Sequence, residues 1–215
     1  MNYRQEFIQF TIQQNVLRFG EFKTKAGRVS PYFFDAGLFY DGAALKNLAQ
    51  FYAKAILAAG VSFDMLFGPA YKGIPLVAAV AIALADGGRS VRYSFNRKEV
   101  KDHGEGGSVI GAPLAGKVLI VDDVISAGTS VRESVNLIRG SNAVPCGVVI
   151  ALDRMERGSG ALSAVQEVKA SYNVPVISIA TLDDLVTFLK AEPRHAQHLA
   201  AVGRYREQYG VTAHA

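Results

Sequence analysis

The sequence lacks the residues that several classes of protein require. It contains one cysteine, Cys146, which excludes an intrachain disulfide and any zinc or iron–sulfur site built from several thiolates. A single thiol suits a reducing compartment, so we expect a cytoplasmic protein. The most hydrophobic run, Ile74 to Ala85, is shorter than the roughly 18 to 20 residues that a membrane helix needs. Residues 1–10 also lack the apolar stretch of a secretory signal, and no membrane partner is expected.

A large excess of charge of one sign is absent as well. The chain has 23 Lys and Arg against 19 Asp and Glu, which gives a formal net charge of +4 at pH 7. This small excess suits a polyanionic small ligand better than a DNA scaffold, so we expect no nucleic-acid partner. The length of 215 residues, half of them apolar, allows one large α/β domain over residues 1–215 and is short for two domains.

Apolar residues follow two spacings that alternate along the chain. Helical spacing predicts helices near residues 7–16, 45–56, 74–86, 129–139, 182–189 and 198–209. Short apolar runs predict strands at residues 64–68, 90–95, 117–123, 147–152 and 174–179. The run at 117–123 shows no polar alternation, which is typical of a parallel strand buried on both faces. The alternation of strands and helices predicts a central, mainly parallel sheet flanked by helices.

The segment between residues 97 and 116 interrupts this pattern. It is polar and contains four glycines, at positions 104, 106, 107 and 111. Such a segment is too rich in glycine for a packed element and is long enough to be a mobile lid. Long loops of this kind often carry function, so we expect functional residues in it.

Two carboxylates, Asp122 and Asp123, end the central strand. Open α/β sheets bind ligands at the carboxyl ends of their strands, and the loop Ser126 to Ser130 that follows opens a helix. Backbone N–H groups freed by Gly128, three hydroxyls and the positive helix end can hold a phosphate. The two carboxylates can accept hydrogen bonds from nearby sugar hydroxyls. The alternative is a capped helix beside a solvated acidic pair.

A second phosphate motif fails on inspection. Gly111 to Lys117 matches most of a Walker A loop, but Val118 replaces the required Ser or Thr. In addition, Lys117 begins a predicted strand, whereas the lysine of a P-loop begins a helix. Nucleoside triphosphatase activity is therefore not expected.

The stretch Val121 to Thr129 resembles the phosphoribosyl pyrophosphate (PRPP) motif of type I phosphoribosyltransferases. Four further segments resemble the orotate phosphoribosyltransferases in particular: Ser30 to Phe34, Phe67 to Pro75, Phe95 to Gly107, and Leu152 to Arg157. The resemblance extends over nearly the whole chain.

The resemblance implies the type I phosphoribosyltransferase fold, with a small hood from about the first 40 residues and a mobile lid at about residues 98–111. The implied reaction transfers ribose 5-phosphate from PRPP to N1 of orotate, which releases pyrophosphate and gives orotidine 5′-monophosphate for pyrimidine synthesis. Mg²⁺ is implied as a complex with PRPP, with no direct protein ligand. A homodimer is also implied, in which the lid acts on the partner subunit's site.

The resemblance also assigns residues to PRPP. The loop after the central strand takes the 5-phosphate and the ribose hydroxyls, through Asp122, Asp123, Val124, Ile125, Ser126, Ala127, Gly128, Thr129 and Ser130. The pyrophosphate meets Tyr71 and Lys72, in a loop where the family has a cis peptide, here Ala70–Tyr71. Further contacts fall on Lys25, Arg97, Lys98, Lys101 and His103. Lys101 is implied to be catalytic, with Asp122 and Asp123, because a cation stabilises the departing pyrophosphate. The alternative for these lid cations is a solvated charge run.

Orotate is flat and carries a carboxylate, so its site needs an aromatic or backbone slot and a cation. The resemblance places Phe33, Phe34, Ser126 and Arg154 there, with Arg154 on the carboxylate. The family often has Thr where this chain has Ser126, and the hydroxyl is retained. For Phe33 and Phe34 the alternative is simple core packing.

Two other functions stay open from the sequence. The chain could be a regulator that senses PRPP without catalysis, although it offers no room for a DNA-binding module. It could also be a purine phosphoribosyltransferase, against which Arg154 and the Phe33–Phe34 segment argue.

Overall fold

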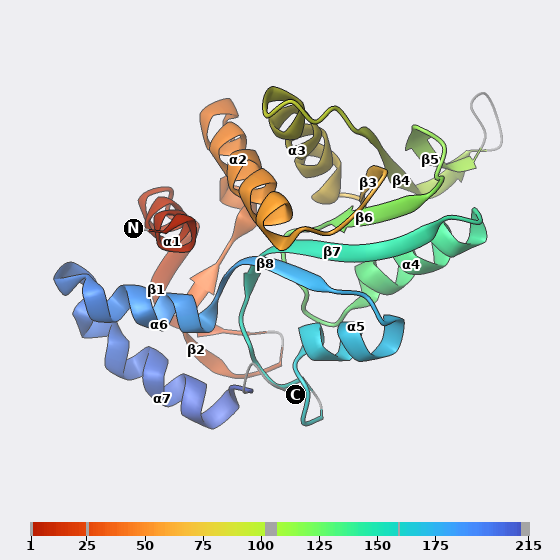
Figure 1. The fold of residues 1–215 in the computed structure, drawn as a ribbon. Helices are drawn as coiled ribbons and strands as arrows, with labels where there is room; N and C mark the ends of the chain where they lie inside the picture. Colours follow the sequence, from red (N-terminus) through yellow and green to blue (C-terminus); the bar gives the residue numbers. More distant parts are fainter. Residues whose placement is uncertain (1, 25, 102–106, 159, 212–215) are drawn as a thin grey trace.

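The strands of this protein form two separate sheets in the computed structural model, which describes residues 2–24, 26–101, 107–158 and 160–211 (Figure 1). The large sheet has the order β5-β4-β3-β6-β7-β8, and the small one pairs β1 with β2. The strands of the small sheet are β1 (Leu17–Lys23) and β2 (Val29–Phe34). Those of the large sheet are β3 (Met65–Gly68), β4 (Arg92–Lys101), β5 (Gly107–Gly111), β6 (Lys117–Val121), β7 (Val144–Asp153) and β8 (Val176–Thr181).

The large sheet is mainly parallel, which confirms the predicted fold class. Strand β3 pairs in parallel with β4 and β6, and β6, β7 and β8 continue the parallel order. Only β5 runs antiparallel, on β4 at the edge of the described sheet. The carboxyl ends of β3 and of its neighbour β6 therefore lie side by side, and this is where the predicted ligand loops begin.

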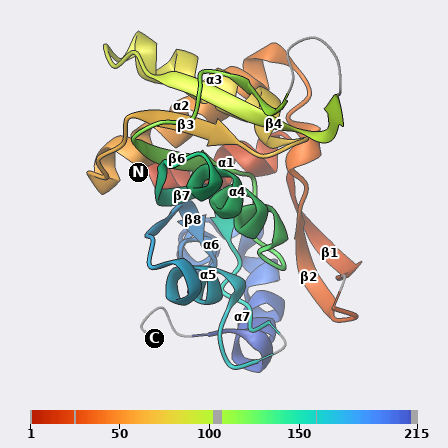
Figure 2. The ribbon, with the colours of Figure 1, turned by 90° about the vertical axis from the view of Figure 1, so that its right-hand side faces the viewer.

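Helices cover both faces of the large sheet (Figures 1 and 2). Side chains of α2 and α3 pack on one face, and those of α4 and α5 pack on the other. The described helices are α1 (Tyr3–Gln13), α2 (Gly42–Ala59), α3 (Gly73–Asp86), α4 (Thr129–Gly140), α5 (Ala164–Tyr172), α6 (Leu182–Ala191) and α7 (Leu199–Tyr209), with short 3₁₀ turns η1 (Ala36–Leu38) and η2 (Pro193–His198).

The position of β6 in the middle of the sheet explains why its sequence does not alternate between apolar and polar residues. Leu119 and Val121 point into the core beneath α2 and α3, whereas Val118 and Ile120 point into the core beneath α4 and α5. Both faces of the strand are thus buried from Val118 to Val121, so each of these four positions is apolar, and only Lys117 at its start is exposed. This rigid central strand holds the start of the loop that follows it.

The hairpin of β1 and β2 stands apart from the large sheet, beside α7 (Figure 2). The sequence did not predict β1, and the register explains why. The pairing shifts between Phe19 and Phe22, so a bulge breaks the alternation that would mark a strand. The hairpin and α1 both come from the first 40 residues, to which the resemblance assigned the hood, and β2 contacts α7 from the end of the chain.

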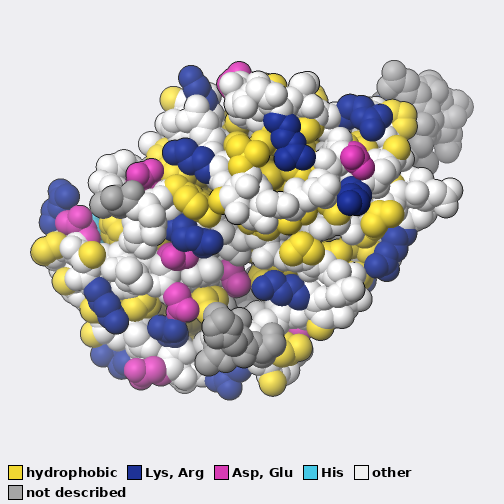
Figure 3. Space-filling view, in the orientation of Figure 1, with side chains coloured by type: hydrophobic (Ala, Val, Ile, Leu, Met, Phe, Trp, Pro, Cys, Tyr) yellow, Lys and Arg dark blue, Asp and Glu magenta, His cyan; other side chains and the backbone are white. Residues whose placement is uncertain are grey.

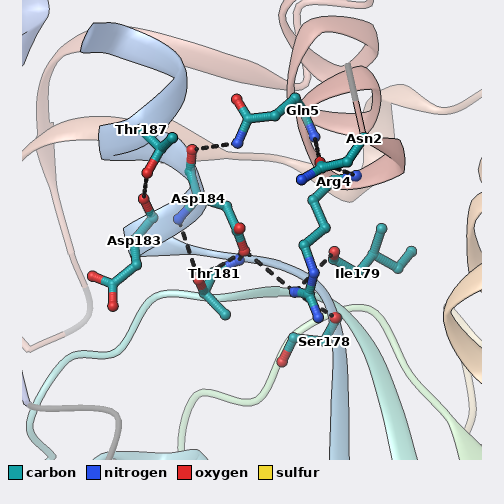
Figure 4. Close-up of polar contacts among 9 residues, drawn as sticks. All are labelled: Asn2, Arg4, Gln5, Ser178, Ile179, Thr181, Asp183, Asp184 and Thr187. Carbon is teal, nitrogen blue, oxygen red and sulfur yellow. Dashed lines mark hydrogen bonds and ion pairs between the residues drawn. The ribbon is translucent and has the colours of Figure 1, made fainter. Parts of the chain in front are cut away.

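An arginine anchors α1 to the rest of the molecule (Figure 4). The Nη1 atom of Arg4 donates to the carbonyls of Ser178 and Ile179 in β8, at 3.5 and 3.4 Å, and to Asp184 at 3.3 Å. Asp184 also forms a capping box with Thr181 at the start of α6. Helix α1 is therefore fixed to the end of β8, although Arg4 precedes Ser178 by 174 positions in the sequence.

Two boundaries differ from the prediction. Helix α1 ends at Gln13, so Val16 packs into the core from the link that follows the helix. The glycine-rich segment is not wholly irregular: β4 extends to Lys101, and Gly107–Gly111 forms β5 against it. Gly111 takes a φ of 98° there, a conformation that glycine adopts easily. Residues 102–106 lie outside the described chain.

Lys and Arg side chains are spread over the face seen in Figure 3, interspersed with acidic side chains and apolar areas. No single-sign stripe of the kind that binds a nucleic-acid backbone occurs on this face. Among the described residues, no helix combines the length and the apolar character needed to cross a bilayer.

We predict that Gly68, at the end of β3, does not tolerate a side chain. A Cβ there would lie 2.2 Å from the carbonyl oxygen of Gly73 and 2.7 Å from a Val77 methyl. Gly68→Ala should lower the free energy of unfolding by roughly 1 to 3 kcal/mol or more in urea titrations. Gly203→Ala is the control, because nothing lies within 4 Å of a Cβ there and alanine favours helix α7. Equal stability of Gly68→Ala and the wild type would contradict this packing.

Candidate functional site

The side chain of Asp122 is almost fully buried at the end of β6. Its Oδ2 accepts a hydrogen bond of 2.6 Å from the Ser130 hydroxyl, and its Oδ1 accepts one of 2.9 Å from the backbone N–H of Asp123. The Tyr52 hydroxyl of α2 donates to the Asp122 carbonyl at 2.8 Å. Asp122 is therefore fixed from both helical layers, by α2 through its carbonyl and by α4 through its carboxylate.

Burial makes Asp122 a weaker acid than usual. Its carboxyl has a pKa of about 6, and the largest cause is the loss of solvent on burial, which raises the pKa. The nearby charge of Asp123 also raises it, whereas hydrogen bonds from the Ser130 hydroxyl and the Asp123 backbone lower it. Near neutral pH the group thus carries a charge that the free protein stabilises poorly. A ligand that donates hydrogen bonds to this carboxylate would relieve that cost.

The neighbouring carboxylate, Asp123, connects two loops. Its Oδ2 forms an ion pair of 2.9 Å with Nζ of Lys72, from the loop after β3, and its Oδ1 accepts 2.7 Å from the Val124 N–H. Partial burial lowers the pKa of Lys72, but the Asp123 carboxylate outweighs it and raises the pKa above its ordinary value. The structure thus brings the predicted residues Lys72, Asp122 and Asp123 together.

Helix α4 begins at Gly128, which has a φ of 68° and offers no side chain to cap the helix. Helix α3 begins at Lys72, also without a side-chain hydrogen bond to its first turn. By contrast, side chains cap the starts of α1, α2, α5 and α6, and α7, which also lacks a side-chain cap, follows directly on the 3₁₀ turn η2. The N–H groups of a helix start seek an acceptor, and an anion is a suitable one. Both loops predicted to hold phosphates therefore end at helix starts without side-chain caps.

The loop after β3 has the cis peptide that the resemblance implied, between Ala70 and Tyr71. The N–H of Ala70 donates 2.7 Å to Oδ1 of Asn96, which lies in the adjacent strand β4. The Tyr71 ring is exposed, with Nζ of Lys98 5.2 Å from its centroid. The loop is thus held by β4, and a predicted lid cation, Lys98, already lies beside Tyr71.

Arg154, which follows β7, lies in a cluster of polar and aromatic side chains. Oε1 of Glu156 accepts hydrogen bonds from its Nε at 2.9 Å and its Nη2 at 2.6 Å. Nη2 also lies 2.9 Å from the Ser30 hydroxyl, and the guanidinium carbon lies 4.3 Å from the centroid of Tyr32. The cation is therefore held by the β1–β2 hairpin as well as by its own loop.

The two phenylalanines predicted for orotate lie in different surroundings. The side chain of Phe34 is 8% exposed and packs 6.5 Å from Phe7 in the core, so its ring has the packing role given above as the alternative. Phe33 is 36% exposed and stacks on Phe22 at 5.5 Å, with the Arg18 guanidinium over its ring. Of the two rings, that of Phe33 is the one exposed to a ligand.

The remaining predicted residues fall into three groups. Ser126 and Ala127 are exposed in the loop before α4, Thr129 is exposed at the first position of α4, and Val124 and Ile125 are half-buried. Arg97 lies in β4 and interacts within the described chain. Lys25, His103 and the side chain of Lys101 lie outside the described residues.

The sequence prediction missed several residues of the site. Tyr52 was assigned only to an apolar helix face, and its hydroxyl bond to Asp122 depends on how α2 packs. Asn96, Ser30 and Glu156 lie in segments that carried the resemblance, but no pattern showed their partners. Only the pairing of Glu156 with Arg154 could have been expected from the sequence, because a carboxylate two positions from an arginine can form an ion pair with it.

The carboxylates at the end of β6 fit a magnesium ion that is bound mainly by the phosphates of a substrate. All four of their oxygens accept hydrogen bonds, from Asp123 N–H, Ser130, Val124 N–H and Lys72. No three His, Cys, Asp or Glu side chains of the described chain converge to form a metal site. Mg²⁺ is commonly bound by few carboxylates together with waters and substrate phosphates, which agrees with this donor set.

Comparison with known proteins adds independent evidence. Residues 38–180 match the family model of the phosphoribosyl transferase domain. The chain is 66% identical over 210 residues to the orotate phosphoribosyltransferase of Thiobacillus denitrificans, with 98% of this chain and 99% of the relative covered. It is 65% identical over 210 residues to that of Chromobacterium violaceum, with 98% of each covered.

A solved structure agrees with these relatives. The crystal structure of orotate phosphoribosyltransferase from Francisella tularensis is similar, with a TM-score of 0.88 and 41% identity. The match covers 96% of this chain and 100% of that one. The similarity therefore extends over nearly all of both chains.

The raised pKa of Asp122 predicts how Asp122→Asn changes stability. The folded carboxyl holds its proton up to pH of about 6, whereas the unfolded one releases it near 3.8. The wild type should therefore lose stability as the pH rises through this window, because ionisation is unfavourable only in the folded state. The free energy of unfolding of Asp122→Asn should fall less over that window, because the variant has no carboxyl to ionise there. At pH 7.5 the variant should therefore be more stable than the wild type by roughly 1 to 3 kcal/mol. Urea titrations at pH 4.5 and 7.5 measure this, and a less stable variant at pH 7.5 would contradict it.

Proposed function

Since the chain belongs to the orotate phosphoribosyltransferases, which are pentosyltransferases of pyrimidine biosynthesis, we propose that it transfers ribose 5-phosphate from PRPP to N1 of orotate in a magnesium-dependent reaction. Pyrophosphate and orotidine 5′-monophosphate are the products. Membership of this family favours an enzyme over a regulator that only senses PRPP. The single free thiol supports a reducing compartment, and we place the reaction in the cytoplasm.

The observation that carries the proposal is the pairing of two helix starts without side-chain caps around one acidic pair. The start of α4 receives the 5-phosphate on the loop from Ser126 to Ser130, and Asp122 and Asp123 accept hydrogen bonds from the ribose hydroxyls. The start of α3, with Tyr71 and Lys72, meets the pyrophosphate. The ion pair between Lys72 and Asp123 sets the distance between the two loops.

The chemical step breaks the bond between C1 of the ribose and the pyrophosphate oxygen, and forms a bond from C1 to N1 of orotate. The bonding electrons leave on the pyrophosphate, which gains charge, and N1 of orotate releases its proton to the departing pyrophosphate or to solvent. Lys101 stabilises that charge, with Arg97, Lys98 and His103 beside it, and Lys25 contacts PRPP. When bound together with PRPP, magnesium would neutralise part of the same charge, and Asp122 and Asp123 would lie beside it. Water must be excluded at this stage, and the lid at about residues 98–111 is proposed to do so.

Orotate is held by its carboxylate on Arg154 and by contacts with Phe33, with the backbone at Phe34 and with the Ser126 hydroxyl. The buried guanidinium selects against uracil, which has no carboxylate to accept from the part of the cation that Glu156 does not engage. The cluster around Arg154 supports this role, since a well-oriented cation suits a planar carboxylate.

Following orotate absorbance after mixing the protein with PRPP and Mg²⁺ tests the function directly. We expect orotate to be consumed and pyrophosphate to be released in equal amounts. Uracil, hypoxanthine and adenine serve as control bases and should not react, and chelation of Mg²⁺ should stop the reaction. Consumption of a purine in place of orotate would contradict the proposal.

We also propose a homodimer in which the lid of one subunit completes the site of the other, and a mixing experiment tests this. Lys101→Ala and Asp122→Asn/Asp123→Asn should each be nearly inactive. After subunit exchange, a mixed dimer has one site with both defects and one with neither, so activity should approach one working site per mixed dimer. If exchange is demonstrated by mass and no activity returns, the lid serves its own subunit.

A further inference from the structure

The guanidinium of Arg154 is restrained along one edge before any ligand binds. Its Nε and Nη2 atoms both donate to Oε1 of Glu156, at 2.9 and 2.6 Å. Nη2 lies 2.9 Å from the Ser30 hydroxyl, and the face of the cation lies on Tyr32. These contacts fix the plane of the guanidinium and its rotation within that plane.

The same contacts leave one nitrogen for a ligand. The hydrogen bonds of Arg154 to Glu156 and Ser30 run through Nε and Nη2, so Nη1 takes part in neither of them, and Tyr205 is a further polar neighbour of the guanidinium. A guanidinium on a flexible side chain would have to be ordered on binding, which costs free energy. Here that ordering is already complete, and it depends on Glu156 more than on any other single residue.

Glu156 also compensates the charge of the cation. The side chains of Arg154 and Glu156 are only 23% and 15% exposed, so neither charge is well solvated. Burial lowers the pKa of Arg154, but Tyr32 and Glu156 outweigh this and raise it, which keeps the group charged. Removing one member of a poorly solvated pair leaves the other without compensation.

We propose that Glu156 is a positioning residue for orotate selection, which acts by holding Arg154 so that Nη1 faces the orotate carboxylate. The inference rests on the proposed role of Arg154 in binding orotate. In this proposal Glu156 acts through Arg154 and not on the substrate itself, since its Oε1 accepts from both Nε and Nη2 of the guanidinium. Its effect should therefore disappear when Arg154 is absent.

A double-mutant cycle tests this, with KM for orotate measured at saturating PRPP, and KM for PRPP and kcat measured alongside. Glu156→Ala should raise KM for orotate about tenfold or more, since a charge-assisted hydrogen-bond pair is lost. KM for PRPP should stay within about twofold, because the PRPP loops do not contact Glu156. Combined with Arg154→Ala, Glu156→Ala should add nothing to the effect of Arg154→Ala alone.

Two further variants separate position from charge. Glu156→Gln keeps an oxygen that accepts from Nε and Nη2, so KM for orotate should stay within about threefold of the wild type. Glu156→Asp keeps the charge but shortens the side chain by one methylene, so its oxygen no longer reaches Arg154 and KM for orotate should rise. This variant replaces Glu156→Ala if Glu156→Ala does not fold. A merely structural role would instead lower the melting temperature and kcat without changing KM for orotate selectively.

Glu192→Ala is a matched control, because Glu192 also pairs with an arginine two positions away, Arg194, at 3.3 Å, but on an exposed turn. It should leave KM for orotate unchanged. If Arg154→Ala itself does not change KM for orotate, the proposed role of Arg154 fails. If Arg154→Ala raises KM but folded Glu156→Ala and Glu156→Asp do not, the positioning role of Glu156 is wrong while the proposed function stands.

Discussion

A carboxylate that the fold buries at the end of its central strand is the constraint on which the site depends. Asp122 follows a strand that is apolar on both faces, and it is fixed by Tyr52 from one helical layer and Ser130 from the other. Burial raises its pKa to about 6, so the folded protein keeps an unfavourable charge at neutral pH. Functional sites commonly retain such groups at a cost in stability.

The rest of the site is arranged around this group. Asp123, the next residue, pairs with Lys72, which joins the loop after β3 to the loop after β6. Each loop then runs into a helix start without a side-chain cap, so one acidic pair lies between two positions that favour anions. A ligand with a phosphate at one end, a pyrophosphate at the other and hydroxyls between them fits this order.

The sequence predicted the parts of the fold that local pattern controls. The uninterrupted apolar run of β6 and the spacing in α2 and α3 follow from burial, so they could be predicted, as could the acidic pair after β6. Strand β1 could not, because a bulge between Phe19 and Phe22 removes the alternation. The partners of Asn96 and Glu156 could not be predicted either, since both contacts join segments or atoms that only the packed fold brings into place. The resemblance assigned Phe34 to orotate, with core packing as the alternative, and only the packed fold shows that its ring is buried.

The central claim is that Asp122 and Asp123 bind the sugar of PRPP, and ligand-induced stabilisation measures this most directly. Thermal unfolding at pH 7.5 is followed with and without PRPP and Mg²⁺, for the wild type and for Asp122→Asn/Asp123→Asn. At about 100 times its dissociation constant, PRPP should stabilise the wild type by roughly 2.7 kcal/mol and raise its Tm by several degrees. The variant should fold but gain less than about half of that stabilisation, because it lacks the carboxylates that accept from the ribose. An equal rise in Tm for both proteins would contradict the account.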